Sequence, residues 1–76
     1  MDLDNLIVMA NRIGQFFAAQ PDRDEALAGI AEHVRKFWEP RMRSQLLAAL
    51  DNDASAALSD IVRAALTTHR ASLQPA

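Results

Sequence analysis

Apolar residues recur at three- and four-residue steps through the first part of the chain, which is the period of one face of an α-helix. Asp2 or Asp4 can cap the start of this helix, because a carboxylate there accepts hydrogen bonds from free backbone N–H groups. The pattern predicts a helix that ends near Ala18. Its apolar stripe consists of Leu3, Leu6, Ala10, Ile13 and Phe17.

A second helix follows the segment "AQPD". Asp22 followed by Glu25 is a variant of the capping box, with Asp in place of Ser or Thr. Pro40 ends this helix, because proline lacks a backbone N–H and disfavours helical geometry in the residue before it. Phe37 lies on the flank of the apolar stripe, which consists of Leu27, Ile30, Ala31, Val34 and Trp38.

The rest of the chain predicts two shorter helices. Pro40 suits the first position of a third helix, which extends to Leu50 on the stripe Met42, Leu46, Ala49 and Leu50. "DNDAS" then supplies a turn in which Asp53 or Ser55 caps a fourth helix that fades near Ser72. The apolar residues of this fourth helix are Leu58, Ile61, Val62, Ala65 and Leu66.

These patterns predict an all-α fold, a compact small bundle of three to four short amphipathic helices. We expect a single helical domain over residues 1–72 and a frayed tail over 73–76. Gly14 and Gly29 fall inside helices, where glycine costs about 1 kcal/mol relative to alanine, so we expect close helix–helix approach at both. Ile7 and Val8 project away from the main stripe and are expected on the surface, as a second possible contact patch.

The composition limits the chemistry that the chain can perform. It has no cysteine, which excludes disulfides and thiolate ligation of zinc or iron–sulfur clusters. His33 and His69 are too far apart for a motif of paired metal ligands, and neither a nucleophile elbow nor a glycine-rich phosphate loop occurs. His69 fits a partly buried structural residue near a helix end. We therefore find no catalytic residues and no metal site, and expect a protein that is not an enzyme.

The longest apolar run, "LIVMA", is far shorter than a membrane span, and the N-terminus is acidic rather than basic. We expect a cytoplasmic protein without a membrane partner.

Half of the eight Lys and Arg residues lie in the segment "HVRKFWEPRMR", residues 33–43. Cations between aromatic residues are typical of single-strand nucleic-acid grooves. The remainder of the chain is acidic, however, and would repel a polyanion, so we expect no nucleic-acid partner. A protein-docking patch fits better, since arginine is enriched at protein interfaces and Arg41 and Arg43 flank Met42. The simpler alternative is that these arginines cover apolar surface and pair with nearby acids.

Two blocks of sequence resemble a known family. "NRIGQFF", which begins at Asn11, precedes the block of His33 and "FWEPRMR", and the order and spacing of both are similar to the delta subunit of cytoplasmic, NAD-dependent, molybdenum-containing formate dehydrogenases. The resemblance covers residues from about 3 to 66, and Glu39 stands where Asp would be more usual. It implies a non-catalytic accessory subunit that binds the catalytic alpha subunit and supports its assembly, stability or molybdenum-cofactor insertion.

The resemblance also implies where the redox groups lie. The bis-molybdopterin guanine dinucleotide, iron–sulfur clusters and FMN are expected in partner subunits, with no cofactor in this chain. We expect partner contacts from His33, Arg35, Lys36, Arg41, Arg43 and Arg12, and a structural corner from Phe16, Phe17, Phe37, Trp38, Pro40 and Met42.

Two alternative functions stay open at this point. The chain could instead be a small helical regulatory or nucleic-acid-binding module, or a transient chaperone for the pterin cofactor. A homodimer is possible when the chain is isolated.

Overall fold

Capping side chains and a proline set the limits of the first three helices. The structure, a computed structural model, describes residues 2–75. Asp2 accepts a hydrogen bond from the backbone N–H of Asp4 at 3.1 Å, and Asp22 accepts one from Glu25 at 3.2 Å. Pro40 is the first residue of the third helix. The elements are α1 (Leu3–Ala18), α2 (Arg23–Phe37), α3 (Pro40–Leu50), a 3-10 helix η1 (Asp53–Ala57), α4 (Asp60–Thr68) and α5 (Arg70–Leu73). The predicted all-α fold is confirmed.

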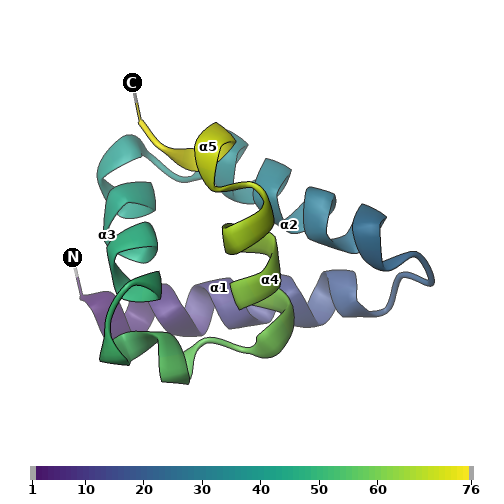
Figure 1. Cartoon of the computed structure of the whole chain (residues 1–76), viewed down its shortest axis with the longest axis horizontal. Coiled ribbons are helices and arrows are strands. Elements are labelled where there is room, and N and C mark those ends of the chain that lie inside the picture. Colours follow the sequence, from purple (N-terminus) through teal and green to yellow (C-terminus); the bar gives the residue numbers. More distant parts are fainter. Residues whose placement is uncertain (1, 76) are drawn as a thin grey trace.

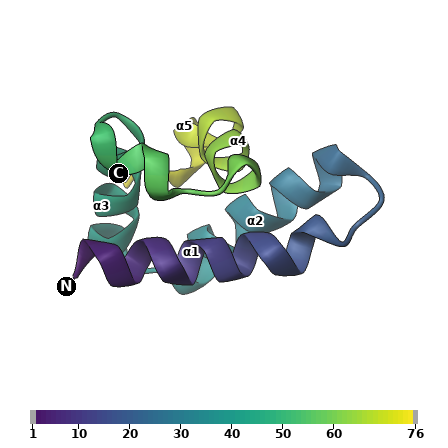
Figure 2. The ribbon, with the colours of Figure 1, turned by 90° about the horizontal axis from the view of Figure 1, so that it is seen from below.

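The helices are arranged around an open V. α1 and α2 are its arms, joined by residues 19–22, and α3 closes the open end by leading from the end of α2 back towards the start of α1 (Figure 1). α4 contacts both arms, and α4 and α5 lie on one side of them (Figure 2). In the part of the chain that the structure describes, no helix is both long and apolar enough to cross a membrane.

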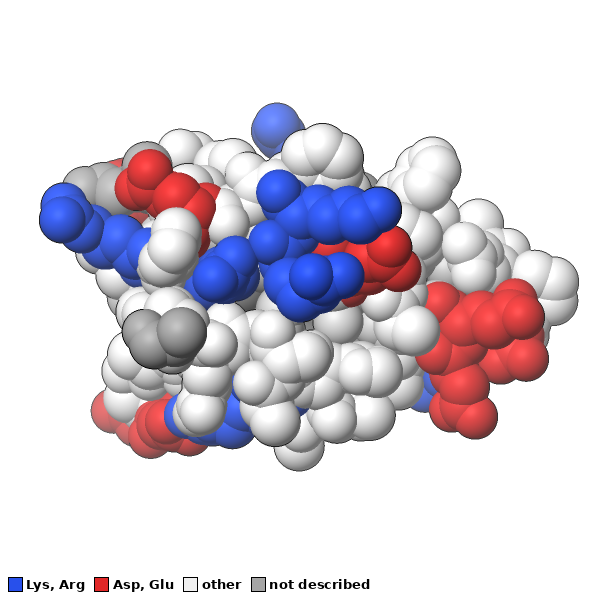
Figure 3. Space-filling view, turned by 90° about the horizontal axis from the view of Figure 1, so that it is seen from above, with Lys and Arg blue, Asp and Glu red and all other residues white. Residues whose placement is uncertain are grey.

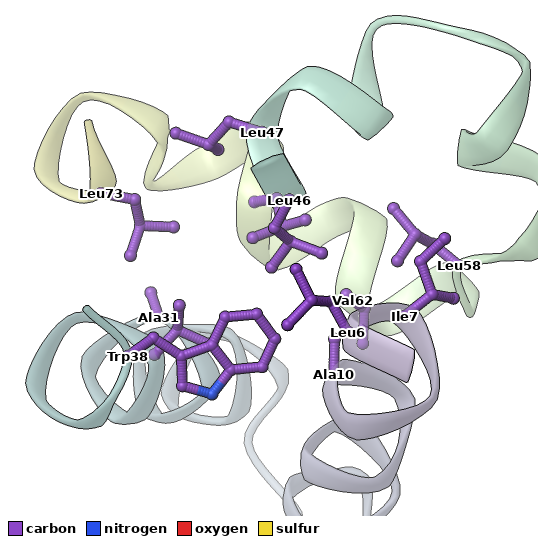
Figure 4. Close-up of a cluster of buried hydrophobic side chains, with 12 residues drawn as sticks. Leu6, Ile7, Ala10, Ala31, Trp38, Leu46, Leu47, Leu58, Val62 and Leu73 are labelled. Carbon is purple, nitrogen blue, oxygen red and sulfur yellow. The ribbon is translucent and has the colours of Figure 1, made fainter. Parts of the chain in front are cut away.

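The main core fills the V where the second helix ends. Trp38 directs its indole between α1 and α3 and is 5% exposed (Figure 4). A smaller cluster, near the end of the V where residues 19–22 join α1 to α2, consists of Leu27, Ile30 and Ala65. The buried members of the main core are Leu6, Ile7, Ala10, Ala31, Val34, Trp38, Leu46, Leu47, Leu58, Val62, Leu66 and Leu73.

Both helical glycines lie at close approaches, as the sequence predicts. A Cβ atom on Gly14 would lie 2.7 Å from Cγ2 of Val62, so this glycine allows α4 to pack tightly against α1. A Cβ atom on Gly29 would lie 2.5 Å from Cε1 of Phe17, so the ring of Phe17 on α1 packs directly against the backbone of α2.

The start of the fourth helix differs from the prediction. Asp53 and Ser55 lie inside η1, whose cap is Asn52, with its side chain accepting from the N–H of Ala54 at 2.8 Å. α4 begins only at Asp60. The prediction was wrong because "DNDAS" forms a short helical turn of its own before the chain turns into α4.

The C-terminal region also differs. The fourth helix is interrupted at His69, which ends α4 and precedes α5. Leu73, assigned from the sequence to a frayed tail, is 1% exposed and packs in the main core (Figure 4). The interruption redirects the chain so that one apolar side chain beyond α4 reaches the core. Ala76 lies outside the described residues.

The surface pair predicted on the first helix is half correct. Val8 is 47% exposed, but Ile7 is only 5% exposed and lies beside Leu58, just beyond η1 (Figure 4). The buried face of α1 is therefore wider than one stripe, because α3 and the η1 segment cover a second side of the helix.

Candidate docking surface

The aromatic residues expected in one structural corner separate into two groups. Trp38 is buried as predicted, and Phe17 and Met42 are half-buried. Phe16 and Phe37, however, are 74% and 71% exposed, so they lie on the surface and are not buried with Trp38 in the structural corner that the sequence predicts. Both lie off the apolar stripe of their helix, and no element covers them. Pro40 is exposed as the first residue of α3.

Four rings lie on adjoining parts of α1 and α2, and we call Phe16, Phe17, His33 and Phe37 the aromatic surface. Phe16 and Phe17 meet edge to face, with ring centroids 5.2 Å apart. His33 and Phe37, one turn apart on α2, have centroids 4.8 Å apart. Edge-to-face and tilted ring pairs are favourable geometries, so the exposed rings are held in place by their neighbours.

The aromatic surface contains two open hollows. One, of about 360 Å³, is lined by Arg12, Ile13, Phe16, Phe17 and His33. The other, of about 250 Å³, is lined by Phe17, Gly29, Glu32, His33, Lys36 and Phe37. Phe17 and His33 line both, so the hollows are neighbours on one face. Their walls are mainly apolar, with charged side chains at the edge.

Four basic residues lie where α2 ends and α3 begins, and we call Arg35, Lys36, Arg41 and Arg43 the basic cluster. Figure 3 shows Lys and Arg side chains on this face. Lys36 pairs with Glu32 at 3.1 Å, and both side chains are more than half exposed. Arg12, Arg35 and Arg41 are exposed, and among the described residues none of them pairs with an acid. These three guanidiniums are free to contact a partner. The simpler alternative included pairing of Arg41 and Arg43 with nearby acids, and neither forms an ion pair among the described residues.

Arg43 differs from the other cations of this cluster. Its Nη1 donates to the carbonyl oxygens of Arg35 at 2.9 Å and of Trp38 at 3.2 Å. The last carbonyls of a helix have no partner within the helix, so Arg43 satisfies two of them at the end of α2. The sequence predicted Arg41 and Arg43 as equivalent contact residues, whereas in the structure Arg43 fastens α3 to α2.

Asn11, which belongs to the first resembling block, also has a structural role. Its side chain donates to the carbonyl of Ala57 at 3.0 Å and accepts from the N–H of Ser59 at 2.9 Å. It thereby fixes the turn into α4 against α1. Sequence patterning missed this role, because the two partners lie more than 45 residues away along the chain.

Among residues 2–75, no group of three or more His, Asp or Glu side chains is arranged so that it could hold a metal ion, and the chain has no cysteine. His69 is partly buried at the junction of α4 and α5, as expected. The carboxylate of Asp51 accepts two hydrogen bonds from Arg70, at 2.9 and 2.5 Å, and these lower the pKa of Asp51. This pair joins the end of α3 to α5 and shares no residue with the aromatic surface.

Comparison with known proteins agrees with the resemblance of the two blocks. No curated protein and no solved structure shows significant similarity to the chain. A family model, however, matches residues 5–66, which is most of the chain, and its description is NADH-dependent formate dehydrogenase delta subunit FdsD. The match includes the whole aromatic surface and the basic cluster. The chain therefore belongs to the family of NADH-dependent formate dehydrogenase delta subunits.

Proposed function

We propose that this chain is a non-catalytic accessory subunit that binds the catalytic subunit of formate dehydrogenase and supports its assembly, stability or molybdenum-cofactor insertion. Family membership identifies the complex. The observation that supports direct binding is the exposure of Phe16 and Phe37 on one face of a small folded domain.

Two exposed phenylalanines need a physical reason in a chain of 76 residues. Burying a phenylalanine side chain is worth about 1.5–3 kcal/mol, and this domain leaves two of them in water. Aromatic residues are enriched at protein interfaces, where a few of them contribute most of the binding energy. A partner that covers the aromatic surface would recover this energy.

The proposal assigns the redox chemistry to the partner subunits. An iron–sulfur cluster needs thiolate ligands, which this chain lacks. The molybdopterin and flavin groups are likewise placed in the partners, and the role of this chain is to hold protein surfaces together. The isolated chain is therefore expected to have no formate-oxidising activity.

Co-purification tests the proposal. The tagged chain is expressed with the other subunits, and the catalytic subunit that stays bound and the formate-dependent reduction of NAD are measured. Phe16→Ala combined with Phe37→Ala should weaken binding by at least about 30-fold, because each truncation of an interface anchor costs at least about 1 kcal/mol. Val8→Ala, at the second possible contact patch of α1, is the comparison: because Val8 lines neither hollow, binding should fall much less than in the double variant.

The outcomes separate the parts of the proposal. A wild-type chain that retains no catalytic subunit would overturn the accessory role. Formate turnover by the isolated chain would overturn its non-catalytic character. Normal binding by the double variant would leave the accessory role intact but place the contact outside the aromatic surface. Arg41 of the basic cluster would then be the next residue to test.

A further inference from the structure

The two hollows of the aromatic surface are suited to two apolar side chains from one partner segment. They share Phe17 and His33, while Phe16 bounds one of them and Phe37 bounds the other. Phe17 is held by its contact with Gly29, where there is no Cβ atom to lift the ring. The dividing wall between the hollows is therefore formed before a partner binds.

Basic side chains stand beside both hollows. Arg12 lines the first and Lys36 lines the second. Among the described residues, the only acid that lines either hollow is Glu32, which pairs with Lys36. The charged lining of the two hollows is thus two cations and one acid, so the aromatic surface is locally positive within a chain whose net charge is −2. Complementary charge on a partner would be negative.

This charge distribution disfavours two other occupants. A two-fold dimer centred on the aromatic surface would bring the cations of both copies together, because each copy contributes the same patch. A nucleic acid needs a larger basic surface than these few cations, and the acidic remainder of the chain would repel it.

On the basis of the proposed function, we infer that the aromatic surface receives a segment of the catalytic subunit that presents two apolar side chains with carboxylates beside them. The apolar side chains enter the two hollows. Carboxylates on the same segment meet Arg12 and Lys36 at the edges.

Charge reversal with a matched control tests this inference. Binding of the purified chain to the catalytic subunit is measured at low and high salt for wild type, Arg12→Glu, Lys36→Glu and Arg23→Glu. Arg23 is also exposed and unpaired among the described residues, but it lines neither hollow, and its reversal changes the net charge as much as the other two. All variants should melt within a few degrees of wild type, because these side chains are on the surface and the lost Lys36–Glu32 pair contributes only about 0.5 kcal/mol.

Each reversal at the hollows should weaken binding about tenfold at low salt, whereas Arg23→Glu should stay within about twofold of wild type. The difference should shrink at about 1 M salt, where charges are screened beyond about 3 Å. Equal binding by all four proteins would overturn the inference while leaving the accessory role intact. Absence of wild-type binding would instead contradict the proposed function.

Two further measurements identify other occupants. Sedimentation of the isolated chain should show no dimer that depends on the aromatic surface, so wild type and the double variant Phe16→Ala, Phe37→Ala should sediment alike. A DNA duplex should bind wild type no more tightly than Arg12→Glu. A wild-type dimer that is lost in the double variant would show that a second copy occupies the surface, and DNA binding that is lost in Arg12→Glu would show a nucleic acid. Either result would overturn the inference.

Discussion

Two neighbouring aromatic residues at the end of α2 have opposite surroundings. Trp38 is buried in the main core, whereas Phe37 is 71% exposed beside His33. One step along the helix turns a side chain by about 100°, so adjacent residues can serve the interior and the surface. The comparison separates a region that holds the fold together from a region that is available for a partner.

The largest expected effect comes from truncating the buried member of this pair. Trp38→Ala should lower the free energy of unfolding by about 3–5 kcal/mol, because it removes a large side chain and leaves a cavity in the main core. A domain of this size has a stability of only a few kcal/mol, so the variant should be largely unfolded. Urea unfolding followed by circular dichroism measures the change.

Phe37→Ala is the control at the adjacent position. It removes an aromatic side chain that contacts mainly solvent and His33, so the free energy of unfolding should change by less than about 0.5 kcal/mol. A similar decrease in the free energy of unfolding in both variants would contradict this division, since Phe37 would then support the fold as Trp38 does.

The sequence predicts the parts of this structure that depend on neighbouring residues. Asp22 and Pro40 act through their own backbone neighbourhood, and the limits of α2 and α3 follow from them. The burial of Ile7 and Leu73 depends on which distant segment covers them, and helical periodicity contains no such information. The same holds for Arg43, whose partners are known only once α3 has folded back on α2.

The candidate site shows the same division. The sequence identifies the residues of the aromatic surface and the basic cluster, but it does not place Phe16 and Phe37 on the surface, where both are exposed. Both lie off the apolar stripe of their helix, and this position predicts exposure better than their aromatic character predicts burial.

Arg43 and Arg41 give a comparison with an intermediate effect. Arg43→Ala should lower the free energy of unfolding by about 1–2 kcal/mol, because two carbonyls at the end of α2 lose their donor. Arg41→Ala removes an exposed guanidinium without an ion pair among the described residues, so its effect should be less than about 0.5 kcal/mol. Urea unfolding of both variants measures the difference, and equal stabilities would contradict the fastening role of Arg43.

The smallest expected effect concerns the ion pair of Asp51 and Arg70, which joins α3 to α5. Asp51→Asn should lower the melting temperature slightly at pH 7, because Arg70 stabilises the ionised carboxylate of the folded protein. The hydrogen bonds from Arg70 lower the pKa of Asp51 below its ordinary value near 3.8. The folded protein therefore binds fewer protons than the unfolded chain in this pH range, and stability must rise with pH there.

Melting temperatures of wild type and Asp51→Asn, compared from pH 7 to pH 2, test the sign of this effect. The contribution of the pair is complete above the unfolded pKa, and it disappears as the pH falls through the lower folded pKa. The difference in melting temperature between the two proteins should therefore be constant near neutral pH and should shrink towards zero at acid pH. Asp53→Asn, on the neighbouring η1 and without an ion pair among the described residues, is the matched control and should follow wild type. A difference that persists unchanged at the lowest pH would show that Asp51 stabilises the fold by some means other than its charge.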